Sequence, residues 1–562
     1  MSELLAAARA WIEGDPDPGT RAELGALVEA GDLAELASRL TPLTFGTAGL
    51  RGPVGAGSSR MNLAVVVRAA YGVARYVEEA GLADRPLVIG FDARPTSRAF
   101  AEASASVWLA RGLAVVAFTE PVATPLCAYL GRELGAAATV VVTASHNPRG
   151  DNGYKVYGPD AVQIVSPTDA QIAAHIASAP RASEVSRSAL AGVTWVQPSQ
   201  LDGYYAAVSA AVPRGAAQRD LTIVHSALHG VGTEPMLRAL SEGGFSRVTT
   251  VPEQRAPDGT FPTTPFPNPE EPGTLDLALA EVERRGAELL LVNDPDADRL
   301  AAAARLDGVV TVLDGNQLGA LLADAAMSGA RVGSTPLVLS SVVSSPLVSS
   351  IARSRGAHAE RTHTGFKWLW HAALALEAGG AGTFCFAYEE ALGYSVFSAV
   401  RDKDGIAAGR ALAELAASLK ARGATLFDRL FELHREHGLW MSAARNITLQ
   451  GAGAAGRVAA RLDALVATAR IRIGAEHVTS IVDYRRGAEG RAPWLGAAPL
   501  LELSLESGAR LLIRPSGTEP KLKLYGHVRR VVTQRSEYAA ALAEARLFAS
   551  QLLRELEQTL DL

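Results

Sequence analysis

Short apolar runs alternate along most of the chain with longer, alanine-rich stretches. The runs contain no charged residue, as expected of strands buried on both faces of a parallel sheet, and they lie at 87–91, 113–118, 138–142, 221–224, 289–292, 337–339 and 383–386. The stretches between them have helical spacing, as over 100–111. This alternation predicts three mixed α/β blocks with largely parallel sheets.

The two ends of the chain have different patterns. Residues 4–40 carry Ala, Leu and Glu at helical spacing, which predicts a helical segment. From about residue 441, strand-like runs and two helical stretches predict an α+β block. At roughly 150 residues per domain, the length predicts about four domains. We place them at 1–200, 201–318, 319–440 and 441–562.

Composition excludes several classes of protein. Hydrophobic residues make up 48% and charged residues 20%, which is typical of a folded chain, and the formal net charge of −5 gives no general attraction to nucleic acid or to an anionic membrane. Two cysteines, Cys127 and Cys385, supply neither a disulfide framework nor a cysteine zinc site. The first residues lack the basic stretch of a signal peptide. We therefore expect a cytoplasmic protein with no nucleic-acid or membrane partner.

A serine loop follows the apolar run that ends at Val142. Its sequence, Thr143-Ala144-Ser145-His146-Asn147-Pro148, lies where the carboxyl end of a parallel strand would present a ligand site. Ser145 could act as a nucleophile or phosphoryl carrier, or the segment could be an ordinary polar turn. We do not expect His146 to serve as the base for Ser145, because neighbouring side chains on an extended turn point apart, and no nucleophile elbow surrounds the serine.

An acidic loop follows the run that ends at Val292. Asp294, Asp296 and Asp298 recur at every second position, and two like charges ~4 Å apart repel by about 4 kcal/mol at an effective dielectric of 20. A divalent cation relieves this repulsion, and an all-oxygen ligand set favours Mg²⁺ over Zn²⁺. The alternative is a solvated acidic turn. Arg299, directly after the aspartates, indicates a phosphate partner.

Four further segments have the composition of ligand loops. Arg514-Pro515-Ser516-Gly517-Thr518 could form a nest for a phosphate dianion. A glycine-dense loop over 45–52 carries Arg51, paired Glu389 and Glu390 could hold sugar hydroxyls, and Lys403 lies in a charged turn. Solvated turns remain the alternative reading of each segment.

Two other segments match patterns that we interpret structurally. Residues 451–456 fit the spacing G-x-G-x-x-G, but no suitable βαβ unit surrounds them, so we interpret them as an Ala/Gly loop. The proline-rich segment 258–272 is a loop by composition. It is either a connector or a structural element beside the site.

The order and sequence of these loops resemble those of the α-D-phosphohexomutase superfamily, which includes phosphoglucomutases and phosphomannomutases. The resemblance extends from residue 45 to residue 521. It implies an α/β fold in which three related mixed α/β domains and a C-terminal α+β domain, similar to the TATA-box-binding protein, surround a central cleft.

The resemblance also implies a mechanism. Ser145 would be a phosphoserine that donates its phosphoryl group to the sugar, and Mg²⁺ would be held by Asp294, Asp296, Asp298 and an oxygen on phosphorylated Ser145. The bisphosphorylated sugar would turn around and return its other phosphate to Ser145. A sugar bisphosphate would therefore act as an activator.

The remaining site residues are assigned by the same resemblance. Lys155 matches a lysine implicated in acid–base transfer, and Lys403, Arg51 and His146 match other active-site positions. The residues expected to bind substrate are Glu389, Glu390, His363, Lys367, Arg299, Arg514, Ser516, Gly517 and Thr518.

One position departs from the pattern of hexose-specific members. Ala391 stands where they usually have a serine, so the loop is most similar to that of the subgroup with phosphopentomutases and glucose-1,6-bisphosphate synthases. A lost hydroxyl contact can change sugar discrimination by ~1–3 kcal/mol. We predict a mutase for glucose or mannose 1- and 6-phosphates, acting as a monomer or homodimer. The alternatives are a phosphopentomutase, a phosphatase and a non-catalytic phosphosugar-binding protein.

Overall fold

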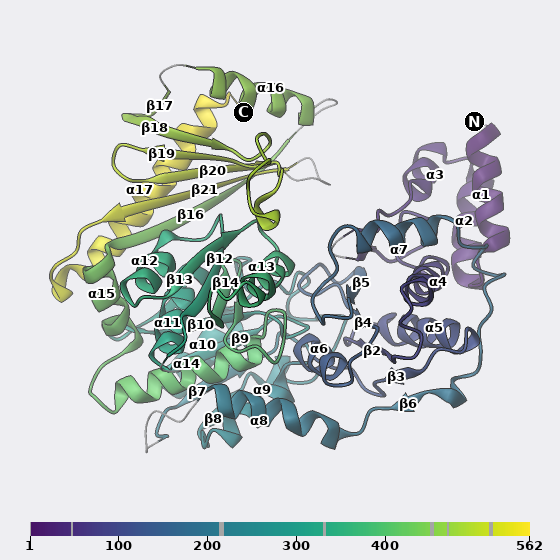
Figure 1. Cartoon of the computed structure of the whole chain (residues 1–562), viewed down its shortest axis with the longest axis horizontal. Helices are drawn as coiled ribbons and strands as arrows, with labels where there is room; N and C mark the ends of the chain where they lie inside the picture. Colours follow the sequence, from purple (N-terminus) through teal and green to yellow (C-terminus); the bar gives the residue numbers. More distant parts are fainter. Residues whose placement is uncertain are drawn as a thin grey trace. The chain divides into compact units, whose positions relative to one another are not determined.

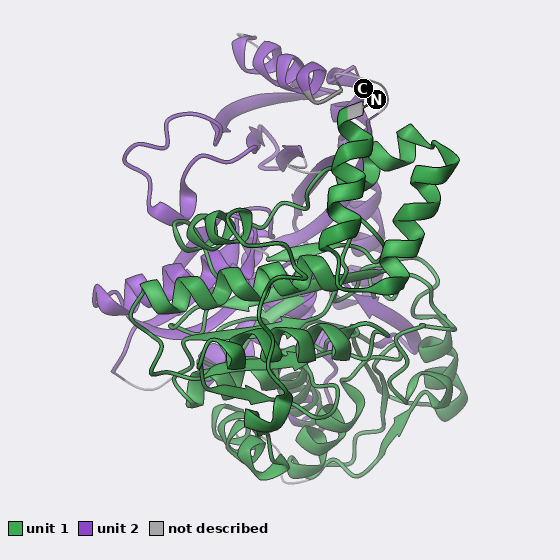
Figure 2. Ribbon diagram, turned by 90° about the vertical axis from the view of Figure 1, so that its right-hand side faces the viewer, with its two compact units in different colours: residues 1–303, 393–417 green, residues 304–392, 418–562 purple. Residues whose placement is uncertain are grey.

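The computed structural model describes residues 2–46, 49–212, 219–329, 333–449, 454–468, 471–515 and 521–561 (Figure 1). The chain divides into two compact units (Figure 2). Unit 1 contains Met1–Ala303 and Gly393–Ala417, and unit 2 contains Ala304–Leu392 and Ser418–Leu562.

The first sheet of unit 1 has six strands in the order β1-β5-β4-β2-β3-β6. They are β1 (Leu50–Pro53), β2 (Leu87–Phe91), β3 (Val115–Ala117), β4 (Ala138–Val142), β5 (Asp151–Tyr157) and β6 (Thr194–Trp195). β2 pairs in parallel with both β3 and β4, and every residue of these three strands is buried. Burial on both faces explains why these strands have uninterrupted apolar sequences.

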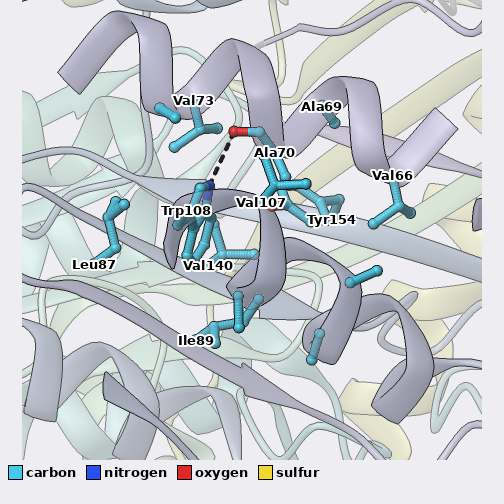
Figure 3. Packing of buried hydrophobic residues seen from close by; sticks show 14 of the residues in the cluster. Val66, Ala69, Ala70, Val73, Leu87, Ile89, Val107, Trp108, Val140 and Tyr154 are labelled. Carbon is cyan, nitrogen blue, oxygen red and sulfur yellow. Dashed lines mark hydrogen bonds between the residues drawn. The ribbon is translucent and has the colours of Figure 1, made fainter. Parts of the chain in front are cut away.

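Helices α5 (Ser97–Ala110) and α6 (Thr124–Glu133) pack against this sheet, and α4 (Leu63–Glu79) packs against α5 and α7 (Thr168–Ala177). Trp108 of α5 is fully buried between the helices and the sheet, near Val73, Val107 and Val140 (Figure 3). Its indole Nε1 donates a hydrogen bond of 2.9 Å to the Ala70 carbonyl of α4. The bond supplies a partner for the only polar atom of this large side chain.

The second sheet has the order β11-β10-β9-β7-β8. Its strands are β7 (Ile223–Ser226), β8 (Val248–Thr250), β9 (Leu289–Asn293), β10 (Leu300–Leu306) and β11 (Val309–Leu313), with helices α8 (Asp202–Ala211), α9 (Thr233–Glu242) and α10 (Asp276–Arg285) in the neighbouring sequence. Most of α14 (Gly405–Lys420) also belongs to unit 1, although it follows the third sheet in sequence. β7 pairs in parallel with β8 and β9. The central strand β9 is buried along its whole length.

A third sheet has the order β13-β12-β14-β15. Its strands are β12 (Pro336–Ser341), β13 (His358–Thr362), β14 (Thr383–Glu389) and β15 (Gly393–Ser395), and its helices are α11 (Gly315–Ser328), α12 (Pro346–Ser354), α13 (Phe366–Ala378) and α15 (Leu426–His437). β12 is parallel to both β13 and β14. The domain thus repeats the α/β architecture of the first two.

The C-terminal sheet is of another kind. Its six strands are antiparallel in the order β16-β21-β20-β19-β18-β17, with bounds β16 (Leu439–Thr448), β17 (Arg472–Ile473), β18 (Glu476–Asp483), β19 (Leu501–Leu505), β20 (Arg510–Pro515) and β21 (Lys521–Arg530). The long helix α17 (Tyr538–Thr559) packs along β16 and β21 (Figure 1). The fold is therefore three α/β domains followed by one α+β domain, which confirms the predicted fold class.

The predicted helical segment 4–40 is confirmed, and it divides into three helices, α1 (Ser2–Gly14), α2 (Pro18–Ala30) and α3 (Leu33–Leu40). Asp17 caps the start of α2 and Gly31, with φ +66°, ends it in the left-handed region that favours glycine. The interpretation of 451–456 as a loop is wrong for residues 454–456, which begin α16 (Ala454–Ala467), and residues 451–453 lie outside the described part.

Within the described ranges, no helix is both long and apolar enough to cross a lipid bilayer.

The Trp108 hydrogen bond gives a stability prediction. Trp108→Phe removes the indole donor and leaves a small void, so we expect the free energy of unfolding of unit 1 to fall by about 1–3 kcal/mol in urea titrations. Trp11→Phe is the matched control, because the buried Trp11 Nε1 has no hydrogen-bond partner among the described residues. Equal losses in the two variants would contradict the role given to the hydrogen bond.

Candidate active site

The serine loop begins where β4 ends, and two hydrogen bonds fix its shape. The Ser145 backbone N–H donates to Thr143 Oγ1 at 2.8 Å, and the Thr143 hydroxyl donates to Asp92 Oδ2 at 2.6 Å. Ser145 itself has φ +53°, in the left-handed region that non-glycine residues rarely adopt. Strain of this kind persists only where the surrounding contacts impose it.

Arg94 supplies most of those contacts. It is 3% exposed, follows β2, and its Nε lies 3.3 Å from Asp92 Oδ2. Its two terminal nitrogens donate to four backbone carbonyls of the serine loop, those of Ser145 (2.7 Å), Asn147 (2.7 Å), Pro148 (2.9 Å) and Asp151 (2.8 Å). The planar guanidinium has five N–H donors in a fixed fork and can serve all four carbonyls, whereas a lysine ammonium has only three donors.

The proline-rich loop packs beside the same arginine. The Phe261 ring centre lies 5.0 Å from the Arg94 guanidinium carbon, and the Arg149 backbone N–H donates to the Pro265 carbonyl at 3.2 Å. Of the two interpretations of segment 258–272, these contacts favour a structural element beside the site.

The acidic loop begins where β9 ends. Asp294, Asp296 and Asp298 are 0–1% exposed, and one carboxylate oxygen from each lies within 4.8 Å of the others. The Ser145 hydroxyl donates to Asp294 Oδ2 at 2.8 Å, so the ends of β4 and β9 meet although 149 residues separate them. A loop hydroxyl and three carboxylates therefore share one buried place in unit 1.

Two lysines and a threonine partly neutralise or bind these carboxylates. Lys155 Nζ donates to Asp296 Oδ2 at 2.6 Å and to Asp298 Oδ2 at 2.7 Å. Lys403 Nζ lies 3.2 Å from Asp298 Oδ2, and the Thr124 hydroxyl donates to Asp296 Oδ2 at 2.6 Å. The structure thus brings the predicted residues Ser145, Lys155 and Lys403 to the three aspartates.

The aspartates can hold a metal ion. The second oxygens, Asp296 Oδ1 and Asp298 Oδ1, are buried and have no hydrogen-bond partner among the described residues. A buried carboxylate oxygen without a partner is costly, and a cation would supply the missing partner. The donor set is entirely oxygen, which suits a hard divalent ion.

The concentration of charge at the site shifts the pKa values of several of its residues. Burial, with the charges of Asp296 and Asp298, raises the pKa of Asp294 well above its usual value. Burial alone would lower the pKa of Lys155, but the two aspartates outweigh it and raise that pKa, so the lysine carries a charge here. Burial, with the charges of Arg299 and Arg51, holds the pKa of His146 well below its usual value.

The expected orientation of His146 is wrong. Its Nδ1 lies 3.1 Å from Ser145 Oγ, within hydrogen-bond distance. The expectation assumed an extended turn, whereas the positive φ of Ser145 folds the two neighbouring side chains together.

Arg51 and Arg299 also lie beside the serine and acidic loops. Arg51 Nη1 donates to Asn147 Oδ1 at 3.0 Å, and burial lowers its pKa. The Arg299 backbone N–H donates to Asp294 Oδ1 at 2.9 Å, and its guanidinium lies 3.4 Å from Glu270. Both side chains bring positive charge to the site where a phosphate could use it.

The other predicted residues belong to unit 2. Glu389 accepts a hydrogen bond of 2.7 Å from the Gly365 backbone N–H, just before Phe366 and Lys367 begin α13. Glu390 Oε2 accepts bonds of 3.0 Å from the hydroxyls of Ser341 and Ser344.

His363 and Arg514 lie on loops and strands of the same unit. His363 Nε2 lies 2.7 Å from the Gly496 carbonyl, and half-buried Arg514 is on β20. Ser516, Gly517 and Thr518 lie outside the described residues.

Sequence reasoning did not identify Asp92, Arg94 and Thr124. The first two follow β2 directly, so the rule that ligand loops follow parallel strands would have selected them. No sequence signal marks Thr124, because its partner Asp296 lies 172 residues away.

Comparison with known proteins agrees with this geometry. The chain matches models of the phosphoglucomutase/phosphomannomutase α/β/α domains I, II and III over residues 42–182, 202–307 and 314–434. The chain belongs to the phosphoglucomutase/phosphomannomutase family. This assignment confirms the predicted membership of the α-D-phosphohexomutase superfamily.

Similar proteins within the family carry different substrate names. A probable phosphoribomutase of Schizosaccharomyces pombe is 35% identical, over 92% of both chains. A probable phosphomannomutase of Haemophilus influenzae is 36% identical, over 83% of this chain and 92% of its own. The structure of a family protein from Burkholderia thailandensis has a TM-score of 0.65 at 19% identity, covering 92% of this chain and 97% of that one.

The chain is accordingly an enzyme of the phosphomutase type, an isomerase of sugar phosphates. This result removes the alternative of a non-catalytic phosphosugar-binding protein. The relatives are named for different sugars, so the comparison identifies the type of enzyme and not the individual sugar.

The four carbonyl bonds of Arg94 give a prediction about positioning. Arg94→Lys retains the charge but cannot hold four carbonyls, so we expect Ser145 to be misplaced and kcat to fall at least about tenfold. Arg98→Lys, at the exposed partner of Glu120, is the control and is expected to retain its rate. A full rate in Arg94→Lys, measured in a coupled mutase assay, would contradict the proposed positioning.

Proposed function

We propose that this enzyme interconverts the 1-phosphate and 6-phosphate of glucose or mannose through a phosphoserine at Ser145. The observation that carries the proposal is the hydrogen bond of 2.8 Å from Ser145 Oγ to Asp294, which unites the hydroxyl and the acidic loop. A phosphoryl carrier needs positive charge and a metal site beside it, and both are available from the residues around Ser145.

The reaction consists of two phosphoryl transfers. In the first, the bond from phosphorus to Ser145 Oγ breaks, phosphorus bonds to the free sugar hydroxyl, and the hydroxyl proton is released. The bisphosphorylated sugar then reverses its orientation. In the second transfer, its original phosphate moves to Ser145 Oγ and the sugar oxygen regains a proton. Serine is thereby phosphorylated again and the substrate is isomerised.

The residues around Ser145 have separate roles in this proposal. Lys155 and Lys403 hold the aspartates and balance their charge, and Lys155 carries a proton at Nζ that it can transfer to a sugar oxygen. Neutral His146, whose Nδ1 lies 3.1 Å from Ser145 Oγ, orients that oxygen. Arg51 and Arg299 bind phosphate oxygens.

We further propose Mg²⁺ as the metal, with Asp294, Asp296, Asp298 and an oxygen on phosphorylated Ser145 as its ligands. The unpartnered buried oxygens of Asp296 and Asp298 support this assignment. When bound, the ion would stabilise charge on the transferred phosphoryl group. The carboxylates position the ion, and the lysines keep the remaining charge balanced.

Residues of unit 2 bind the sugar and its non-reacting phosphate in this proposal. Glu389 and Glu390, with His363 and Lys367, contact the sugar. Arg514, Ser516, Gly517 and Thr518 hold the phosphate. A sugar bisphosphate acts as activator, because an intermediate that dissociates leaves Ser145 without its phosphoryl group, and added bisphosphate restores it.

A pentose phosphate is the second candidate substrate. The S. pombe relative that matches 92% of this chain is named a phosphoribomutase. Within the sugar loop, Ala391 offers no hydroxyl, and Glu390 Oε2 is already bonded to Ser341 and Ser344. A loop with fewer available polar groups suits a sugar with fewer hydroxyls.

Ser145→Ala tests the covalent carrier. Without the hydroxyl no phosphoserine forms, so we expect mutase activity to fall at least about a thousandfold and phosphoryl incorporation from labelled sugar bisphosphate to disappear. Ser186→Ala, at an exposed serine of the same unit, is the control. Turnover by Ser145→Ala at the rate of the control would refute the phosphoserine mechanism.

A substrate panel identifies the sugar. With Mg²⁺ and the matching bisphosphate present, we expect kcat/KM for glucose 1-phosphate or mannose 1-phosphate to exceed that for ribose 1-phosphate by at least about tenfold. The reverse ratio would establish the pentose candidate instead. Inorganic phosphate is measured in parallel, and release faster than isomerisation would identify a phosphatase.

A further inference from the structure

Unit 2 contains a cavity of about 290 Å³ with an unusual lining. Three arginines, Arg353, Arg361 and Arg510, share it with a single acidic residue, Glu502. The walls come from α12, β12, β13, β19 and β20. An excess of two positive charges around a cavity of this size favours the entry of an anion.

The carboxylate of Glu502 does not satisfy all three arginines. It forms a short ion pair with Nε of Arg510. Arg510 is 8% exposed, and its Nη2 donates a hydrogen bond of 2.6 Å to the Val342 carbonyl. The nearest oxygen of Glu502 to Arg361 is 3.5 Å away. Arg353 forms no ion pair or side-chain hydrogen bond with any other residue that the structure describes. Two guanidinium groups therefore retain donors for a ligand.

Two serines line the same cavity. Ser340 is 3% exposed and Ser349 is 6% exposed, and neither forms a side-chain hydrogen bond with another residue of the described ranges. Their hydroxyls can therefore donate to a ligand in the cavity.

We propose that this cavity is an anion site for a phosphate group, either inorganic phosphate or the phosphate of a monoester. The oxygens of a phosphate can accept from guanidinium and hydroxyl donors together, which matches the available donors of Arg353, Arg361, Ser340 and Ser349.

The cavity does not include Arg514, for which we proposed contact with the non-reacting phosphate. Arg510 precedes Arg514 by four residues on the same strand, a separation of ~13 Å at about 3.3 Å per residue. Between them, Leu512 packs into an apolar cluster with Val342, Val343 and Tyr525. The lining of the cavity accordingly includes Arg510 but not Arg514.

One residue connects the cavity with the sugar loop. Ser344 lines the cavity, and its hydroxyl donates to Glu390 at 3.0 Å. Arg510 also donates to the Ser344 carbonyl at 3.4 Å. A ligand bound to the arginines would therefore affect the position of the backbone turn at Ser344, whose hydroxyl binds Glu390.

The test is a crystal soak with tungstate, which has the charge and tetrahedral shape of phosphate and strong anomalous scattering. We expect an anomalous peak between Arg353 and Arg361 in the wild type and its loss in the double variant Arg353→Gln/Arg361→Gln. Both side chains are at least partly exposed, so the variant should fold. Arg422→Gln, at an exposed arginine of the same unit, is the control and should retain the peak.

Competition separates the two sources of the phosphate group. Displacement of tungstate by inorganic phosphate identifies the free ion as a ligand, and displacement by glycerol phosphate but not by inorganic phosphate identifies a monoester. The absence of a peak, a peak that survives in the double variant, or a peak that neither compound displaces would overturn the proposal.

A second measurement in solution does not depend on crystals. Phosphate should slow amide hydrogen exchange of the backbone over 342–345 in the wild type and in Arg422→Gln, but not in the double variant. Equal protection in all three proteins would also overturn the proposal, because the ion would then act elsewhere.

Discussion

Three buried carboxylates within 4.8 Å of one another are the constraint on which unit 1 depends. Their mutual repulsion is strong where little water can screen it, and each acid must therefore have a partner from another segment. Ser145 and Lys155 come from the first domain, whereas Lys403 follows the third sheet in sequence. The site thus also connects the first two sheets, because hydrogen bonds and ion pairs to the three aspartates join the loop after β4 to the loop after β9.

The strands whose bounds were predicted correctly from the sequence are those in which every residue is buried. The strands at 87–91 and 138–142 have the predicted bounds because every residue of each is buried, so their apolar pattern is unbroken. The loops that follow β4 and β9 were also identified, since ligand chemistry gathers at the carboxyl ends of parallel strands. The burial and direction of the strands were therefore enough to predict both the sheets and the place of the candidate site.

What sequence reasoning missed depends on contacts between distant residues or on local backbone geometry. The approach of His146 to Ser145 follows from one positive φ, which is imposed by Thr143 and by Arg94 on another strand loop. The Thr124 hydroxyl reaches an acid 172 residues away. The break between the first two helices was in principle visible, because Asp17 followed by proline is a helix start.

The two oxygens of Asp296, and likewise those of Asp298, have different partners, and this division allows a lysine and a metal ion to share one site. Lys155 binds Asp296 and Asp298 through their Oδ2 atoms, while the Oδ1 atoms stay buried without a described partner. If the ammonium occupied both oxygens of an acid, a metal ion would have to displace it. Because it occupies one, the same carboxylates can bind a lysine and a cation together. The lysine keeps the acids ionised and in place, which is the state that a hard cation requires of its ligands.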